Sequence, residues 1–269
     1  MKSMKSNRIT EKFQELKASG KKGLITYMTA GDPNLETNIE IASIMESAGA
    51  DLIEIGIPFS DPVADGPSIQ QASIRSLSKG ITMLQIIETI GKIRQRVKVP
   101  LIIMTYYNPI LQYGLEKFVV DAVLAGVDGI IVPDLPFEEC GQLFDFTDSA
   151  GLCLIQLVAP TTTDGRMEKI FSRSRGFIYC VSVTGITGIR NEINTDLRSL
   201  TARISKYTTL PIAIGFGIGG PLQAGMVAHY CDAVVVGSAL VDTIAYAKDS
   251  QTMLIQVNSL IKDIKTALS

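Results

Sequence analysis

The sequence contains no tryptophan and a single histidine, His229. The chain therefore has almost no histidine with which to form a Ser-His-Asp triad, a histidine base or a histidine-rich metal site, and we expect no metal centre. His229 itself stands among helix-forming residues and is interpreted as a partly exposed helix residue. The four cysteines lack CxxC spacing and lie in or beside apolar stretches, which indicates packed, reduced thiols instead of a disulfide framework.

Long basic runs and long apolar runs are also missing. The formal net charge is −2, so the sequence does not indicate a basic surface that would bind nucleic acid or an anionic membrane. No apolar run approaches the ~20 residues needed to span a bilayer, and the opening MKSMKSNRITEKF has no apolar signal-peptide region. We therefore expect a cytoplasmic protein whose partner is a small molecule, without nucleic acid or membrane.

Eight short apolar runs are present, each followed by a polar loop and a helical pattern. Their number, together with a chain of 269 residues close to the ~250 typical of such barrels, predicts a single (β/α)8 TIM barrel over residues 1–269. A doubly wound sheet is the alternative. An extra N-terminal helix is expected around Ile9 to Ser19. The predicted strands are Leu24 to Thr29, Asp51 to Ile57, Pro100 to Thr105, Val127 to Val132, Leu152 to Leu157, Gly176 to Val181, Pro211 to Phe216 and Asp232 to Gly237.

Two connections stand out between these runs. The sequence YYNP (Tyr106 to Pro109) is interpreted as the turn that ends the third strand. The segment Ser182 to Asn194 is rich in glycine and threonine, which is typical of a mobile lid or a linker, and a helix is expected after it near Asp196 to Tyr207.

Glu54 is an acid inside an apolar strand. Because side chains alternate along a strand, Ile53 and Ile55 share a packing face and Glu54 points to the other side, into the barrel. A structural ion pair is the alternative to a functional role, but none of the predicted strands contains lysine or arginine. The same absence excludes a strand-borne Schiff-base lysine. Burial should raise the pKa of Glu54, which suits a proton-transfer group.

Asp65 follows Glu54 on the next loop, in the sequence ADGP. Alone it is typical of a solvated turn residue, but its nearness to Glu54 favours a role in the same site.

Two glycine-rich turns, Gly215 to Gly220 and Val234 to Leu240, close the last two strands and open helices. Barrels commonly bind phosphate there, through backbone N–H groups at helix N-termini. The first turn also matches GxGxxG, but a dinucleotide site is rejected because the following acid, Asp232, opens the next strand instead of closing it. Two acids and a phosphate cradle indicate proton transfer on a phosphorylated carbon skeleton, and leave isomerisation, carbon–carbon cleavage and condensation open.

Seven motifs spread from about Tyr27 to Leu240 resemble one known family, the α subunit of tryptophan synthase. They are YMTAGDP, IEIGIPFSDPVADGP, MTYYNP, IIVPDLP, SVTGITG, GFGI and VVVGSAL. The resemblance implies a retro-aldol lyase that cleaves indole-3-glycerol phosphate to indole and glyceraldehyde 3-phosphate in tryptophan biosynthesis. It also implies a β subunit that carries pyridoxal phosphate and receives the indole in an α2β2 heterotetramer, with no cofactor in this chain.

The resemblance also implies roles for single residues. Glu54 matches the family's general acid/base and Asp65 its second catalytic carboxylate. The residues implied to bind substrate are Tyr27, Tyr179, Thr187, Gly188, Phe216, Gly217, Gly237 and Ser238. One departure is Gly219-Gly220, where the family often has a small hydroxyl residue, so a helix N-cap oxygen is missing and the cradle is expected to be looser.

Three alternatives remain: a standalone indole-releasing lyase, a non-catalytic allosteric partner, and another phosphate-binding barrel enzyme.

Overall fold

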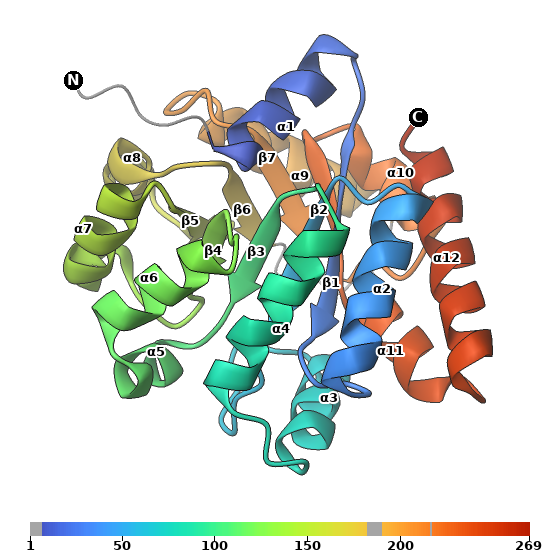
Figure 1. Cartoon of the computed structure of the whole chain (residues 1–269). Helices are drawn as coiled ribbons and strands as arrows, with labels where there is room; N and C mark the ends of the chain where they lie inside the picture. Colours follow the sequence, from blue (N-terminus) through green and yellow to red (C-terminus); the bar gives the residue numbers. More distant parts are fainter. Residues whose placement is uncertain (1–6, 182–189, 216) are drawn as a thin grey trace.

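Parallel strands pair in sequence order and close into a barrel, because β8 pairs with β1 (Figure 1). The structure, a computed structural model, describes residues 7–181, 190–215 and 217–269, with the backbone alone for 190–196. Every predicted strand is confirmed, with ends that shift by one or two residues. The strands are β1 (Gly23–Thr29), β2 (Leu52–Gly56), β3 (Leu101–Met104), β4 (Gly129–Ile131), β5 (Cys153–Val158), β6 (Ile178–Val181), β7 (Ile212–Gly215) and β8 (Ala233–Val236).

Helices surround the barrel and cover its outer face (Figure 1). The closed sheet confirms the (β/α)8 TIM barrel and excludes the doubly wound alternative. The helices are α1 (Arg8–Ala18), α2 (Leu35–Ala48), α3 (Pro67–Leu77), α4 (Met83–Arg96), α5 (Tyr107–Tyr113), α6 (Leu115–Leu124), α7 (Gly141–Ala150), α8 (Asp164–Arg173), α9 (Arg190–Ile204), α10 (Pro221–Ala228), α11 (Ser238–Tyr246) and α12 (Ser250–Ala267), with a 3-10 turn η1 (Phe137–Glu139).

Alternation along β2 directs its side chains as predicted. Ile53 and Ile55 belong to the main apolar core between the strands and the helices. Leu52 belongs instead to a second apolar cluster inside the barrel. Glu54, two residues further on, shares that inward face, so the acid lies inside the barrel above a layer of apolar side chains.

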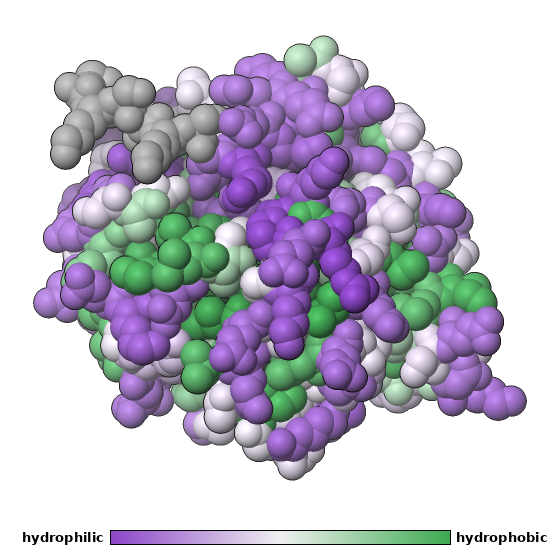
Figure 2. Space-filling model, in the orientation of Figure 1, coloured by the Kyte–Doolittle hydropathy of each residue, from purple (hydrophilic) through white to green (hydrophobic). Residues whose placement is uncertain are grey.

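The helix α1 closes one end of the barrel, and the expected extra N-terminal helix is therefore confirmed. Its apolar stripe, Ile9, Phe13 and Leu16, is at most 5% exposed and joins the inner cluster. The outward surface at the α1 end is mainly hydrophilic (Figure 2), as expected for an amphipathic helix. Arg8 anchors the helix to the rim through a 2.7 Å ion pair with Asp128. Because α1 fills this end of the barrel, the main cavity lies at the opposite end, where the strands finish.

The interpretation of YYNP as a turn is wrong, because the helix α5 begins there. Pro109 occupies the third position of that helix, inside the first turn, where a missing backbone N–H breaks no helical hydrogen bond. Asp134 supports the helix start by accepting a hydrogen bond from the N–H of Tyr107 at 2.9 Å. The helix expected near Asp196 begins earlier, at Arg190.

Two smaller expectations also have an outcome. The four cysteines are free and buried, as predicted. His229 is exposed, but it lies just beyond the end of α10 and not within a helix. None of the described helices is long and apolar enough to cross a membrane.

Candidate active site

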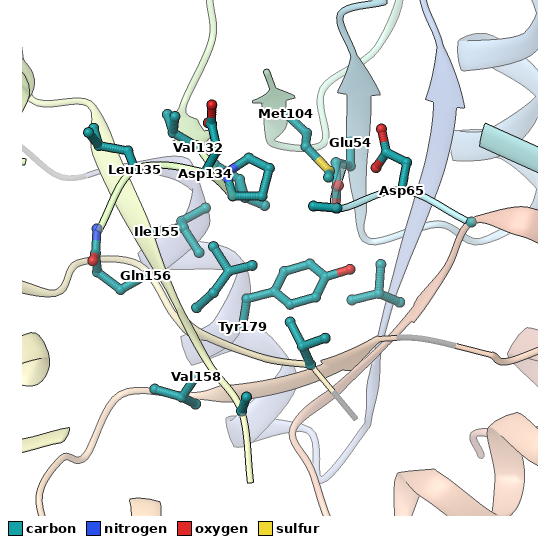
Figure 3. A pocket seen from close by; sticks show the side chains of 18 of the residues that line it. Glu54, Asp65, Met104, Val132, Asp134, Leu135, Ile155, Gln156, Val158 and Tyr179 are labelled. Atoms are coloured by element: carbon teal, nitrogen blue, oxygen red, sulfur yellow. The ribbon is translucent and has the colours of Figure 1, made fainter. Parts of the chain in front are cut away.

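A cavity of about 890 Å³ opens where the strands end, and its lining comes from strand ends and βα loops (Figure 3). Apolar side chains form its floor and walls, among them Met104, Ile131, Ile155 and Leu157. Its polar lining combines predicted residues with polar residues that were not predicted, which are Asp134, Gln156, Thr161, Thr162, Thr163 and Arg166. The predicted site residues that line the cavity are Tyr27, Glu54, Asp65, Tyr179, Gly217, Gly237 and Ser238.

Glu54 is the most strongly buried acid of this cavity. Its side chain is 1% exposed, and its Oε2 atom has no hydrogen-bond partner within the described part of the chain. Burial, helped by the negative charge of Asp65, raises the pKa of Glu54 to about 8. The structural ion pair considered from the sequence is not seen among the described residues, and Glu54 is protonated near neutral pH.

Asp65 lies beside Glu54 at the mouth of the same cavity (Figure 3). It does sit in a turn, since its N–H donates to the carbonyl of Pro62 at 3.0 Å, yet it is half-buried and not fully solvated. Burial raises the pKa of Asp65 to about 6, against the opposing effect of a hydrogen bond from Tyr106. Asp65 is therefore mainly ionised at neutral pH, when Glu54 is mainly neutral.

Tyr106 is a site residue that sequence reasoning missed. Its Oη accepts a hydrogen bond from the N–H of Ala64 at 2.9 Å and donates to the carboxylate of Asp65. One hydroxyl therefore holds both the backbone and the side chain of the Asp65 loop. The available signal was a tyrosine placed directly after the end of a barrel strand, where βα loops converge.

Two tyrosines cross the barrel interior because glycines on the neighbouring strands leave room for them. A Cβ atom on Gly56 would lie 1.9 Å from Oη of Tyr27, and one on Gly215 would lie 2.4 Å from Oη of Tyr179. Tyr27 is paired in register with Glu54, so its ring stands next to the acid. Burial raises the pKa of both phenols well above the usual value, which keeps them neutral.

The predicted phosphate cradle gathers two loops at the cavity rim. Gly237 is the N-cap of α11 and Ser238 its first residue, so the first-turn N–H groups of this helix point toward the rim. Gly217, in the preceding loop, has a positive φ of 74°, a conformation that favours glycine. These three residues are brought together, whereas Thr187, Gly188 and Phe216 lie outside the described residues and stay predictions.

The departure at Gly219-Gly220 has a local substitute. Gly220 is the N-cap of α10 and makes no side-chain cap bond, as expected from the missing hydroxyl. Gln223, in the first turn of the helix, accepts a hydrogen bond from the N–H of Gly219 at 2.6 Å. A side chain from inside the helix therefore ties down the loop that a cap residue would otherwise hold.

Fold and site together define a class: a (β/α)8-barrel enzyme that pairs a neutral and an ionised carboxyl group beside a helix N-terminus suited to an anion. Residues 13–269 match the family model described as Tryptophan synthase alpha chain. The alpha chains of Caldanaerobacter subterraneus subsp. tengcongensis and Thermoanaerobacter sp. (strain X514) are 46% and 45% identical over 262 residues, 97% of this chain and 100% of each relative. The crystal structure of the alpha chain from Legionella pneumophila has a TM-score of 0.91 at 36% identity over 98% of both chains.

The chain belongs to the tryptophan synthase alpha chain family. It is a carbon–carbon lyase of tryptophan biosynthesis that cleaves indole-3-glycerol phosphate, in the role of the alpha subunit. This membership decides against the alternative of another phosphate-binding barrel enzyme.

Proposed function

We propose that Glu54 and Asp65 carry the cleavage of indole-3-glycerol phosphate to indole and glyceraldehyde 3-phosphate, within a single domain that spans residues 1–269. The observation that supports this most is the state of Glu54: it is 1% exposed, with Oε2 unpaired among the described residues, and stands in a cavity wall beside a second acid. A buried carboxyl group without a hydrogen-bond partner is costly to keep, which favours a role in proton transfer.

The proposed mechanism divides the chemistry between the two acids. Protonated Glu54 delivers its proton to C3 of the indole ring, and the resulting carboxylate removes the proton of the adjacent side-chain hydroxyl. The hydroxyl oxygen becomes the aldehyde oxygen, the carbon–carbon bond breaks, and its electron pair returns to the ring to give indole. Ionised Asp65 holds the ring N–H and stabilises the positive charge that develops when C3 is protonated.

The remaining site residues position the substrate. Gly217, Gly237 and Ser238 hold the phosphate at the start of α11, where backbone N–H groups favour an anion. Tyr27 and Tyr179 flank the indole ring from inside the barrel. Thr187 and Gly188, which follow β6 in the sequence, and Phe216, which follows β7, complete the proposed set. No cofactor takes part in this chain.

The pH dependence of the reaction should follow from these roles. We expect kcat/KM to rise as the pH passes about 6, where Asp65 ionises, and to fall as it passes about 8, where Glu54 loses its proton. The measurement is indole release at saturating and at low substrate across this range. A rate that keeps climbing above about pH 9 would contradict a protonated Glu54 as the acid.

We propose a β subunit as the partner, in an α2β2 heterotetramer located in the cytoplasm. The β subunit carries pyridoxal phosphate and receives the indole. The loop between β2 and α3, which carries Asp65, is a candidate contact for the β subunit at the cavity mouth. In favour of this contact, the apolar side chain of Val63 on this loop is 84% exposed. A solved relative from M. tuberculosis, described as tryptophan synthase in an aminoacrylate-bound form, has a TM-score of 0.88 to this chain at 29% identity.

The chain alone and the chain mixed with a β subunit should be compared for indole release from indole-3-glycerol phosphate, together with co-purification. We expect measurable release by the chain alone, a large increase with the β subunit, and a stable complex. Full activity without any increase, and no complex, would favour a standalone lyase. No release in either mixture would favour a non-catalytic allosteric partner.

A further inference from the structure

The helix α3 follows Asp65 directly and supports the loop that carries it. Asp65 is separated from the first residue of α3 by Gly66 alone, the N-cap of the helix. Gln70, in the first turn of α3, donates a hydrogen bond from Nε2 to the backbone carbonyl of Asp65 at 2.9 Å. The position of Asp65 is therefore tied to the position of the first turn of α3.

The first turn of α3 is held by a hydrogen bond to α11. Ser68 donates a hydrogen bond from Oγ to Oδ2 of Asp242 at 3.0 Å, in a half-buried contact between the two helices. Asp242 lies four residues after Ser238, so both share one face of α11. Ile69 of α3 also reaches the start of α11, since a Cβ atom built on Gly237 would lie 3.8 Å from its Cδ1 atom.

The far end of α3 is anchored separately. Arg75, seven residues after Ser68 and so on the same helix face, donates two hydrogen bonds to Asp32, at 2.9 and 2.7 Å. Asp32 is 4% exposed, and Ser76 adds a 2.7 Å bond to the carbonyl of Ala30 in the same β1–α2 loop. The C-terminal half of α3 is fixed to that loop, and the Ser68–Asp242 hydrogen bond is a polar link between its N-terminal half and α11.

We propose that Asp242 is a positioning residue that, through Ser68 and the first turn of α3, sets the place of Asp65 relative to the phosphate cradle at the start of α11. The two halves of the substrate, the indole ring at Asp65 and the phosphate at Gly237 and Ser238, must be held at a fixed separation during cleavage. The Ser68–Asp242 hydrogen bond joins the helices at these two sites and, beside the apolar contact of Ile69, helps to maintain this separation. The inference rests on the proposed role of Asp65.

The test compares single and double replacements at this contact in the full chain. Ser68→Ala and Asp242→Ala should each lower kcat for indole release about five- to tenfold, with KM changed less than about twofold, because loss of positioning affects the reacting geometry more than binding. The double variant should be no worse than either single variant, since both remove one interaction. Asp242→Asn keeps an acceptor oxygen and should stay within about twofold of the parent.

Two further readouts separate positioning from a general loss of stability. In Ser68→Ala the acidic limb of the pH profile should move to lower pH, because a displaced Asp65 loses the burial that raises its pKa. The control is Thr243→Ala, the next residue of α11, whose hydroxyl bonds only to the carbonyl of Ala239 among the described contacts; its kinetics should match the parent.

An unchanged kcat in Ser68→Ala, additive losses in the double variant or an unmoved acidic limb would overturn the inference. If Asp65→Asn also left the rate unchanged, the proposed function itself would fail; if Asp65→Asn lost activity while Ser68→Ala did not, only the positioning role would be wrong.

Discussion

Glu54→Gln is expected to reduce indole formation by roughly 10³-fold or more while the barrel stays folded, because glutamine keeps the shape of the side chain but has no proton to transfer. The ionisable groups nearest to Glu54 offer no ready substitute: the two phenols beside it are held neutral by burial, and Asp65 is mainly ionised. Single-turnover indole release from the purified variant measures the effect. Substantial remaining turnover would contradict the catalytic role of Glu54.

The same replacement should stabilise the fold at alkaline pH. The pKa of Glu54 is about 8 in the folded chain and near its ordinary 4.5 when unfolded, so between these values the folded state holds a proton that the unfolded state releases. Stability is therefore lost as the pH rises through this window, by on the order of 4 kcal/mol at pH 8 and less than about 1 kcal/mol at pH 5. Glutamine does not titrate, and Glu54→Gln should escape this loss.

Urea unfolding of the parent and of Glu54→Gln at pH 5 and pH 8 tests the prediction. The difference between the two chains should be small at pH 5 and clearly in favour of the variant at pH 8. Glu40→Gln on the exposed side of α2 is the matched control, and should give the same difference at both pH values. A variant that is no more stable than the parent at pH 8 would mean that Glu54 is not held protonated by burial.

The direction of Glu54 could be predicted from the sequence because it depends on a local rule. A strand alternates its side chains, and the isoleucines on either side of the acid marked the packing face. The order and number of strands follow from the same kind of local pattern. The barrel and the inward direction of Glu54 can therefore be predicted from the sequence alone.

Other features depend on residues distant in the sequence, and local patterns did not reveal them. The helix α5 replaced an expected turn, because Asp134 reaches back to the N–H of Tyr107 and supports a start that YYNP alone does not indicate. The sequence shows a glycine, Gly56, at a strand end. It does not show why a larger residue is excluded there, which is that the hydroxyl of Tyr27 on the neighbouring strand occupies the space. Pairing between strands and contacts between loops decide which residues fit at such positions.

Asp65 shows the same limit most clearly, because its sequence context describes an ordinary turn. The loop folds inward since Tyr106, which follows the neighbouring strand β3, holds the N–H of Ala64 and the Asp65 carboxylate together. Nothing near ADGP in the sequence indicates that partner. The resemblance to a family suggested a catalytic carboxylate here, and the structure adds the physical reason why this turn residue is half-buried.

Asp65→Asn is expected to lower kcat about 10²-fold, because an amide can still meet the ring N–H through its oxygen but has no charge to stabilise the protonated ring. A second effect should follow at Glu54. The negative charge of Asp65 helps to raise the pKa of Glu54, so its removal should lower that pKa and move the basic limb of the pH profile to lower pH.

The matched control is Asp61→Asn, which makes the same change on the same loop at an exposed position. It should leave both the rate and the basic limb of the isolated chain unchanged. If Asp65→Asn behaved like this control, Asp65 would be a turn residue without a part in the chemistry. A loss of rate with an unmoved basic limb would instead mean that Asp65 acts on the substrate without influencing Glu54, so the shift of the limb is what links the two acids as one pair.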